Sequence, residues 1–248
     1  ASHQLRTPLT AIKGYGSMLL DGTFGPIGGK IKEGVEKVYA STERMVELVN
    51  DLLDTSRLDS GRMAFNFVET DLGEAVKSVC DELMPKGKEK GLAIACTVAT
   101  TTPKVFVDQM KIRQVLVNFV DNALKYSDTG AVEVKLECKR GKDLTQPLLE
   151  GEGNREGDEV VFSVHDNGWG MTPEEMTFLF KKFSRGRGDT SHIKGTGLGL
   201  YVARRLTEAH GGRVWAESAG KGQGSTFFLA LKVGWKPSAD EVYMPKEE

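Results

Sequence analysis

Two glycine clusters enclose a segment of the chain that could bind a nucleotide. Residues 166–171 read Asp-Asn-Gly-Trp-Gly-Met, and residues 195–200 read Gly-Thr-Gly-Leu-Gly-Leu. Residues 160–164 are typical of a buried strand leading to Asp166, and 198–210 of a helix that begins inside the second cluster. Glycines ahead of a helix let backbone N–H groups face a phosphate. The sequence therefore predicts a purine-nucleotide pocket with an acid at one end; two ordinary glycine turns are the alternative.

A helix predicted at about 109–126 carries a second group of polar side chains. Asn118, Asn122 and Lys125 recur at helical spacing on one face. The apolar stripe lies on another face and comprises Ile112, Leu116, Phe119 and Ala123. Amide oxygens can bind a hard cation and an ammonium can bind phosphate, so this face predicts a site for both. A solvated helix face is the simpler alternative.

A third candidate for chemistry is His3, near the start of the chain. It falls outside the apolar seam of a predicted helix, and Thr7 shares its face four residues later. Pro8 is expected to kink that helix. An exposed imidazole is largely neutral at pH 7 and is an accessible nucleophile. Taken by itself, a surface histidine without a role is the more economical interpretation.

Residues 1–62 are expected to form two long helices joined by a breaker-rich turn at 23–29. Apolar or small residues recur in steps of four and three along the second helix, at Ile31, Val35, Val38, Thr42, Met45, Val49, Leu52 and Ser56. This heptad seam predicts packing along the whole helix. Because one hairpin cannot bury the apolar seams of both of its helices, we expect two chains to associate as a four-helix bundle.

The remaining chain alternates predicted strands and helices. Strands are expected at 63–67, 92–98, 104–107, 131–138, 159–165, 213–217 and 225–231, and helices at 71–88, 109–126, 173–183 and 198–210. Residues 141–158 are predicted to form a long exposed loop without an assigned function. The basic residues 184–194 are predicted to form a lid over an anion. Residues 234–248 are a polar tail.

Composition excludes several classes of protein. The formal net charge is −2, so no broad basic surface for nucleic acid or an anionic membrane is expected. The three cysteines, Cys80, Cys96 and Cys138, lack zinc-site spacing and suit a reducing compartment. No apolar run approaches the length of a membrane span, and no signal peptide is visible.

Together these motifs resemble a known family. Residues 2–10, Ser-His-Gln-Leu-Arg-Thr-Pro-Leu-Thr, resemble the H-box of bacterial sensor histidine kinases, and residues 118–127 resemble their N-box. The first glycine box, the F-box and the second and third glycine boxes are matched by Asp166-x-Gly168-x-Gly170, Phe180-x-x-Phe183, Gly195-x-Gly197-x-Gly199 and residues 222–227. The boxes follow the family's order across nearly the entire chain.

The resemblance implies an α+β chain with two domains. Residues 1–62 would be a dimerisation and phosphotransfer hairpin in a dimeric four-helix bundle. Residues 63–233 would be a Bergerat-type α/β sandwich that binds ATP, as in gyrase, MutL and heat-shock chaperones. On this resemblance Asp166 binds the adenine amine, Asn122 holds Mg²⁺ with Asn118 near the phosphates, and Lys125 contacts phosphate. The other nucleotide contacts carried over are Tyr126 against the base, Arg185 near the γ-phosphate, and Gly168, Gly170, Phe183, Lys194, Gly195, Thr196, Gly197, Leu198, Gly199 and Thr226.

The same resemblance implies the phosphoryl chemistry. His3 would accept the γ-phosphoryl group and pass it to an aspartate in the receiver domain of a response regulator. Thr7 matches the family position that orients water when the regulator is dephosphorylated. The residue after the histidine is usually acidic, whereas this chain has Gln4. Because an amide cannot take the imidazole proton, and general-base help is worth about 10²–10⁴-fold, we expect retained but slower autophosphorylation.

Two other functions stay open from the sequence. The first is a weakly active kinase that works mainly as a regulator phosphatase or dimeric scaffold, because Gln4 is combined with Thr7. The second is an ATP-driven conformational clamp, against which the heptad hairpin and the H-box argue. His3 lies unusually close to the first residue for this family, so the chain is expected to be a piece lacking its sensor. We expect a cytoplasmic location, with membrane attachment only through upstream segments.

Overall fold

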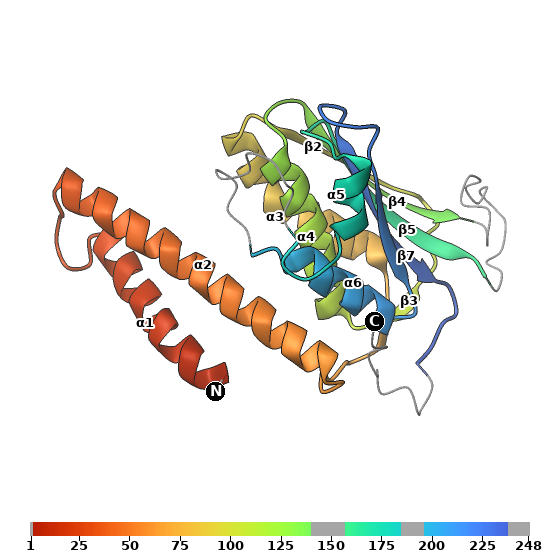
Figure 1. Cartoon of the computed structure of the whole chain (residues 1–248), viewed down its shortest axis with the longest axis horizontal. Helices are drawn as coiled ribbons and strands as arrows, with labels where there is room; N and C mark the ends of the chain where they lie inside the picture. The colour runs from red at the N-terminus through yellow and green to blue at the C-terminus, as the bar shows by residue number, and fades with distance from the viewer. Residues whose placement is uncertain (1, 140–156, 185–195, 238–248) are drawn as a thin grey trace.

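The computed structural model of the chain describes residues 2–139, 157–184 and 196–237, with side chains described from Thr7 onward. Two antiparallel helices, α1 (Ser2–Leu20) and α2 (Gly29–Asp59), form a hairpin that projects from the rest of the molecule (Figure 1). Lys13 pairs with Glu43 across it at 2.8 Å. Gly16 lies against the ring of Tyr39. The predicted two-helix hairpin is confirmed, and α1 remains helical through Pro8.

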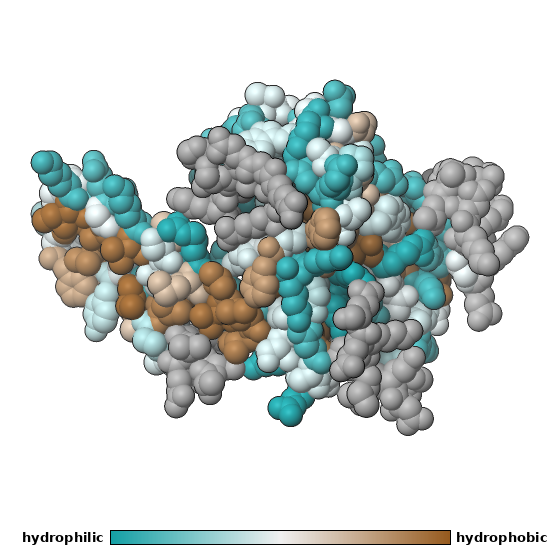
Figure 2. Space-filling view, in the orientation of Figure 1, coloured by the Kyte–Doolittle hydropathy of each residue, from teal (hydrophilic) through white to brown (hydrophobic). Residues whose placement is uncertain are grey.

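The apolar seam of α2 is largely open in the single chain. Ile31, Val38 and Met45 are 61%, 53% and 52% exposed, while only Thr42 of the seam is buried. Figure 2 shows hydrophobic surface along much of the hairpin. Within the described residues, no helix combines the length and apolar character that crossing a membrane requires. The hairpin therefore presents a face suited to packing against another helix.

A five-stranded sheet forms the second part of the molecule. Its strand order is β2 (Ala93–Val98), β4 (Ala131–Lys139), β5 (Glu159–Asp166), β7 (Ser225–Lys232) and β6 (Arg213–Glu217). Only β2 and β4 run parallel; the other neighbours are antiparallel. Three helices, α3 (Leu72–Glu89), α4 (Gln109–Tyr126) and α6 (Gly199–Ala209), lie between this sheet and the hairpin (Figure 1).

The core lies between the sheet and these helices. The predicted apolar stripe of α4 is buried throughout, and Phe119 packs between Phe162 of β5 and Phe227 of β7 at ring distances of 6.5 and 5.6 Å. Because this stripe points at the sheet, the polar face of α4 is turned towards α6 and α2. Asp108 caps α4 by accepting a hydrogen bond from the Lys111 N–H at 3.1 Å.

The predicted elements match the structure except at two places. The strand expected at 63–67 begins later, as β1 (Val68–Thr70), and pairs with β3 (Val105–Val107) in a separate two-stranded sheet. Asn66 donates its N–H to the Asp108 carboxylate instead of to a strand, and Phe65 and Phe67 pack on His210. These contacts replace the expected pairing.

The helix expected at 173–183 ends early, as α5 (Pro173–Phe178). Thr172 caps it and forms a reciprocal capping box with Glu175. Beyond α5 the chain turns, and Phe183 has a φ of 56°, which a right-handed helix does not allow. The predicted loop at 141–158 lies almost wholly outside the described residues, as does the predicted lid except for Ser184.

Candidate functional site

Asp166 occupies the end of β5 and is only 2% exposed. Its Oδ1 accepts a hydrogen bond from the Gly168 N–H at 2.8 Å. Burial raises the pKa of the Asp166 carboxyl, and the backbone N–H groups of Gly168 and Ser225 only partly oppose that rise. A buried, fixed carboxyl group of this kind is placed to accept a hydrogen bond from a ligand amine.

The glycines after Asp166 are required by close backbone contacts. A Cβ built on Gly168 would fall 2.2 Å from the carbonyl oxygen of Tyr126. Gly170 has a φ of 60°, and a Cβ there would fall 2.0 Å from the carbonyl oxygen of Gly220. Only glycine fits at both positions. The first glycine cluster is thereby held against the C-terminal end of α4, beside the partly exposed ring of Tyr126.

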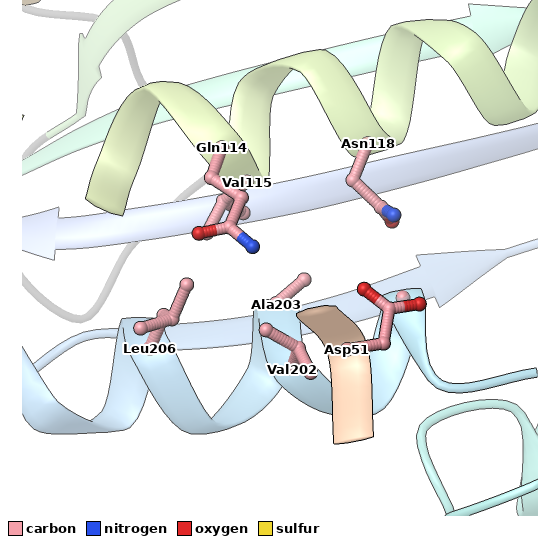
Figure 3. Close-up of a pocket in the computed structure, with 8 residues that line it drawn as sticks. Asp51, Gln114, Val115, Asn118, Val202, Ala203 and Leu206 are labelled. Carbon is pink, nitrogen blue, oxygen red and sulfur yellow. The ribbon is translucent and has the colours of Figure 1, made fainter. Parts of the chain in front are cut away.

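The second glycine cluster meets the polar face of α4. Asn122 donates its side-chain N–H to Asn118 Oδ1 at 3.1 Å. Gly199, the first residue of α6, lies so close to Asn118 that its Cβ would fall 2.3 Å from Asn118 Nδ2. Figure 3 shows Asn118 reaching from α4 into the space above α6. Two motifs about 80 residues apart in the sequence thus share one site.

The described part of the second cluster is a turn that leads into α6. Thr196 Oγ1 accepts a hydrogen bond from the Leu198 N–H at 3.2 Å, and Leu198 is buried. Gly197 has a φ of 72° and lies against the backbone of Phe183. The N-terminal N–H groups of α6 therefore begin beside Asn118, where a phosphate would be stabilised by the helix dipole.

Lys125 lies on the polar face of α4 but is engaged by a neighbour. Its Nζ pairs with Asp121 at 2.6 Å, one turn earlier, and Asp121 also pairs with Lys86. Burial by itself lowers the pKa of the Lys125 ammonium, but the Asp121 carboxylate outweighs that effect and the pKa is raised. Lys125 is consequently a cation at neutral pH, shared between Asp121 and any anion that enters the site.

Thr226 and Ser225 point to opposite faces of the sheet. In the antiparallel pairing of β5 with β7, Asp166 is opposite Ser225 and His165 is opposite Thr226. The Thr226 hydroxyl contacts His165 Nδ1 at 3.0 Å, whereas Ser225 is buried on the side of Asp166. The third glycine box thus brings Ser225 to the site, although the sequence analysis did not name this residue. The alternation of side chains along a strand could have indicated it.

Several predicted residues lie outside what the structure describes. Arg185, Lys194 and Gly195 belong to the undescribed segment 185–195, and the side chains of His3 and Gln4 are likewise not described. Their backbone forms the first turn of α1. The antiparallel register of Lys13 with Glu43 and of Gly16 with Tyr39 puts this turn at the level of residues 51–54 along α2. Thr7 is exposed on α1.

A small cavity opens where α2 meets this site. Its lining includes Asp51, Gln114, Asn118 and Gly199 (Figure 3). The Asp51 carboxylate accepts a hydrogen bond from Thr196 Oγ1 at 2.7 Å. No sequence motif pointed to Asp51, because its role depends on how the two parts of the chain dock.

The site geometry agrees with two family matches. Residues 107–234 match the family described as histidine kinase-, DNA gyrase B- and HSP90-like ATPases. Residues 1–61 match the His Kinase A (phospho-acceptor) domain. The chain belongs to the sensor histidine kinases. The ATPase-type match contains both described glycine clusters and the asparagines of α4, and the phospho-acceptor match contains His3.

Individual histidine kinases are similar over most of the chain. The circadian input-output histidine kinase CikA of Synechococcus elongatus is 34% identical over 91% of this chain, and the methanogenesis regulatory histidine kinase FilI of Methanothrix harundinacea is 31% identical over 93%. The chain spans only 28% and 24% of those two proteins.

Solved structures show the same arrangement of elements. Full-length ShkA in complex with AMPPNP superposes with a TM-score of 0.71 at 28% identity, covering 93% of this chain and 44% of ShkA. The Acinetobacter baumannii histidine kinase AdeS superposes with a TM-score of 0.60 at 23% identity, covering 94% of this chain and 98% of AdeS. At that identity the likeness to AdeS concerns the fold.

Proposed function

We propose that this chain is the catalytic core of a histidine kinase that transfers the γ-phosphoryl group of ATP to its own His3. The carrying observation is the convergence of Asp166, Asn118 and the N-terminus of α6 on one site, in a chain that begins with a phospho-acceptor domain. The hairpin of residues 1–62 supplies the acceptor, residues 63–233 bind the nucleotide, and residues 234–248 are a tail.

Each end of the nucleotide has its own group of residues. Asp166 accepts a hydrogen bond from the adenine amine, and Tyr126 packs against the base. The backbone of Thr196, Gly197, Leu198 and Gly199 faces the phosphates, with Lys125 and, from the undescribed segment, Arg185 and Lys194 adding positive charge. Gly168, Gly170, Phe183 and Gly195 shape the surrounding turns, whereas the Thr226 side chain in β7 lies on the sheet face opposite Asp166. Positioning and charge stabilisation of this kind are sufficient for phosphoryl transfer.

The residues present also fit a magnesium ion. Because Asn122 donates its amide N–H to Asn118, its carbonyl oxygen is the atom that can bind a hard cation. Among the described residues there is no cluster of three or more acidic, histidine or cysteine side chains that could hold a metal on its own. We therefore infer that Asn122 binds Mg²⁺ together with phosphate oxygens. The ion would neutralise charge that develops on the transferred group.

The acceptor chemistry rests on neutral imidazole. A ring nitrogen of His3 attacks the γ-phosphorus, the bond to the bridging oxygen breaks, and ADP leaves with that electron pair. The proton on the other ring nitrogen then passes to solvent. Gln4 can orient the ring through its amide oxygen but cannot remove a proton, so the step is slower than with a carboxylate. Phosphohistidine then passes its phosphoryl group to a response-regulator aspartate. Thr7, exposed on α1 one turn after His3, supports an additional phosphatase activity towards that regulator.

The proposed enzyme works as a homodimer, which the exposed seam of α2 supports. Its need for ATP, together with free thiols at all three cysteines, supports action in the cytoplasm. A weak kinase serving mainly as phosphatase or scaffold is the second candidate, and Thr7 with Gln4 favours it. Under either alternative the nucleotide site is the same.

Incubation with ATP labelled in the γ-phosphate tests the proposal. The parent chain should acquire an acid-labile, alkali-stable label, and His3→Ala should acquire none while still binding nucleotide. Release of free phosphate without labelled protein would instead indicate an ATP-driven clamp. Label that persists in His3→Ala would contradict the assignment of the acceptor.

A further inference from the structure

Three aspartates on one face of α2 fasten the hairpin to the nucleotide domain. Asp51 accepts from Thr196 Oγ1 at 2.7 Å, and Asp54 accepts from Gln114 Nε2 of α4 at 3.3 Å. Asp59 accepts from Lys182 Nζ and from the Tyr201 hydroxyl of α6, both at 2.6 Å. Burial and the hydrogen bond to Asp59 raise the pKa of Tyr201 to about 12, which keeps its hydroxyl a donor. We call Asp51, Asp54 and Asp59 the acidic face.

This contact is a packed interface as well as a polar one. Thr55 and Leu58 fall between the three aspartates at helical spacing, and both are buried although much of α2 is exposed. The acidic face is centred on Asp51, Thr55 and Leu58, whereas Tyr39 and Glu43, further towards the N-terminus of α2, contact α1. None of the three aspartates belongs to the exposed seam, although Asp59 lies seven residues after the seam residue Leu52.

Asp51 brings a carboxylate to the place where phosphate is expected. Its partner Thr196 belongs to the second glycine cluster, and the cavity beneath it is bounded by Asn118 and Gly199 (Figure 3). Burial raises the pKa of Asp51, and the hydrogen bond from Thr196 opposes that rise. A nucleotide polyphosphate would need the same donors and the same helix N-terminus, and it would carry like charge.

We propose that the acidic face is a latch: Asp51 competes with the polyphosphate of a nucleotide for Thr196 and the N-terminus of α6. Filling the site then releases α2 from the nucleotide domain. The inference rests on the proposed nucleotide site and adds a coupling between that site and the position of the hairpin. Because such coupling is reciprocal, weakening the latch must strengthen polyphosphate binding.

The latch also explains how a bound nucleotide would become able to reach His3. In the latched arrangement the first turn of α1 is level with residues 51–54 along α2, while Asp51 and Asp54 are turned towards Thr196 and α4. Transfer requires the nucleotide domain to leave this face and approach α1. Because phosphate displaces the Asp51 carboxylate, the movement of the nucleotide domain depends on whether the nucleotide site is occupied.

Calorimetric titration of the whole chain with magnesium AMPPNP and, separately, with adenosine tests the latch. Asp51→Asn keeps an acceptor for Thr196 but removes the negative charge. Asp59→Ala removes a latch contact that is distant from the groups expected to bind phosphate. Glu36→Gln, an exposed acid elsewhere on α2, is the matched control. We expect Asp51→Asn to bind AMPPNP at least fivefold more tightly and adenosine within twofold of the parent, because adenosine has no phosphate. Asp59→Ala should also bind AMPPNP more tightly, and Glu36→Gln should match the parent.

The outcomes separate the latch from the proposed function. Parent-like or weaker AMPPNP binding by both Asp51→Asn and Asp59→Ala would overturn the latch while leaving the nucleotide site intact. An equal gain for adenosine in Asp51→Asn would overturn competition for the phosphate donors. If neither the parent nor any variant bound AMPPNP, the proposed function would be wrong. The proposed competition between Asp51 and phosphate would then be wrong as well.

Discussion

Gly199 and Asn118 approach so closely that any side chain at position 199 would collide with the amide: a Cβ there falls 2.3 Å from Asn118 Nδ2. Gly199 opens α6, and Asn118 lies on the polar face of α4. This contact fixes the distance between the phosphate-facing helix terminus and the amides proposed to serve the phosphates and the metal. Neither the second glycine cluster nor the polar face of α4 reveals this contact by itself. The site is specified only when the two motifs are taken together.

Gly199→Ala should therefore impair catalysis without unfolding the protein. The methyl group must push Asn118 aside, and a displacement of about 1 Å can reduce a rate by about 100-fold. Because alanine is a better helix former than glycine, the melting temperature should be nearly unchanged. The checks are the rate of phosphoprotein formation and the melting curve. Gly34→Ala, with open space around it, serves as control; a parent-like rate for Gly199→Ala would refute the role of the contact.

Asp166→Asn should weaken ATP binding by about 10- to 100-fold. The amide keeps an oxygen for the Gly168 N–H but loses a charged acceptor for the adenine amine, and such bonds are worth about 1.5–3 kcal/mol. Since burial raises the pKa of this carboxyl, its ionised form opposes folding at pH 7 and the variant should not be less stable. Titration calorimetry with ATP gives the affinity. Exposed Asp81→Asn is the control, and binding within twofold of the parent by Asp166→Asn would contradict the assignment.

The sequence predicted this site well where local spacing determines it. The α4 stripe and the strand leading to Asp166 depend on neighbours in the chain, and each is where the pattern indicated. Ser225 was passed over because its side follows from pairing with Asp166 across two strands. Asp51 could not be found at all, because its partner Thr196 is 145 residues away and meets it only after the domains dock.

The exposed seam of α2 should be the dimer interface. Val38→Glu places a charge in the middle of that seam and should shift the protein to a monomer, because a buried unpaired carboxylate is strongly disfavoured. Light scattering coupled to size exclusion measures the mass at micromolar concentration. Glu33→Lys, also on α2 but outside the seam, should remain dimeric. A parent chain that is already monomeric at that concentration would count against the interface.

Magnesium should act through Asn122. Chelation by EDTA should abolish phosphoprotein formation, and Asn122→Ala should need a higher magnesium concentration to reach half of its maximal rate. The side-chain N–H of Asn122 is bound to Asn118, so its amide oxygen is the atom left to bind the cation. Alanine removes that oxygen. A magnesium titration of the labelling rate provides the readout, with exposed Glu36→Ala on α2 as control. An unchanged magnesium requirement in Asn122→Ala would remove this residue from the proposed metal site.

His210 should make the nucleotide domain sensitive to acid. It is buried at the end of α6, where Nε2 accepts from the Asp108 N–H at 3.0 Å and Nδ1 contacts the Leu206 carbonyl oxygen at 2.6 Å, so the ring is held neutral. Burial lowers its pKa from about 6.5, although Leu206 and Asp108 oppose this. As the pH falls, the unfolded chain binds the proton first. The contribution is therefore complete above about pH 6.5 and is lost between there and the lower pKa of the folded state, by up to about 1.4 kcal/mol per pH unit.

Urea unfolding at pH 7.5 and pH 5.5, compared between the parent and His210→Phe, isolates this residue. Phenylalanine suits the neighbouring rings of Phe65 and Phe67 but leaves the Asp108 N–H without its acceptor, so the variant should be less stable by about 1–3 kcal/mol at pH 7.5. Its further loss at pH 5.5 should be smaller than that of the parent, because the titrating ring is gone while the other acids and bases remain. Equal losses in the two proteins would mean that His210 is not the group that binds the proton.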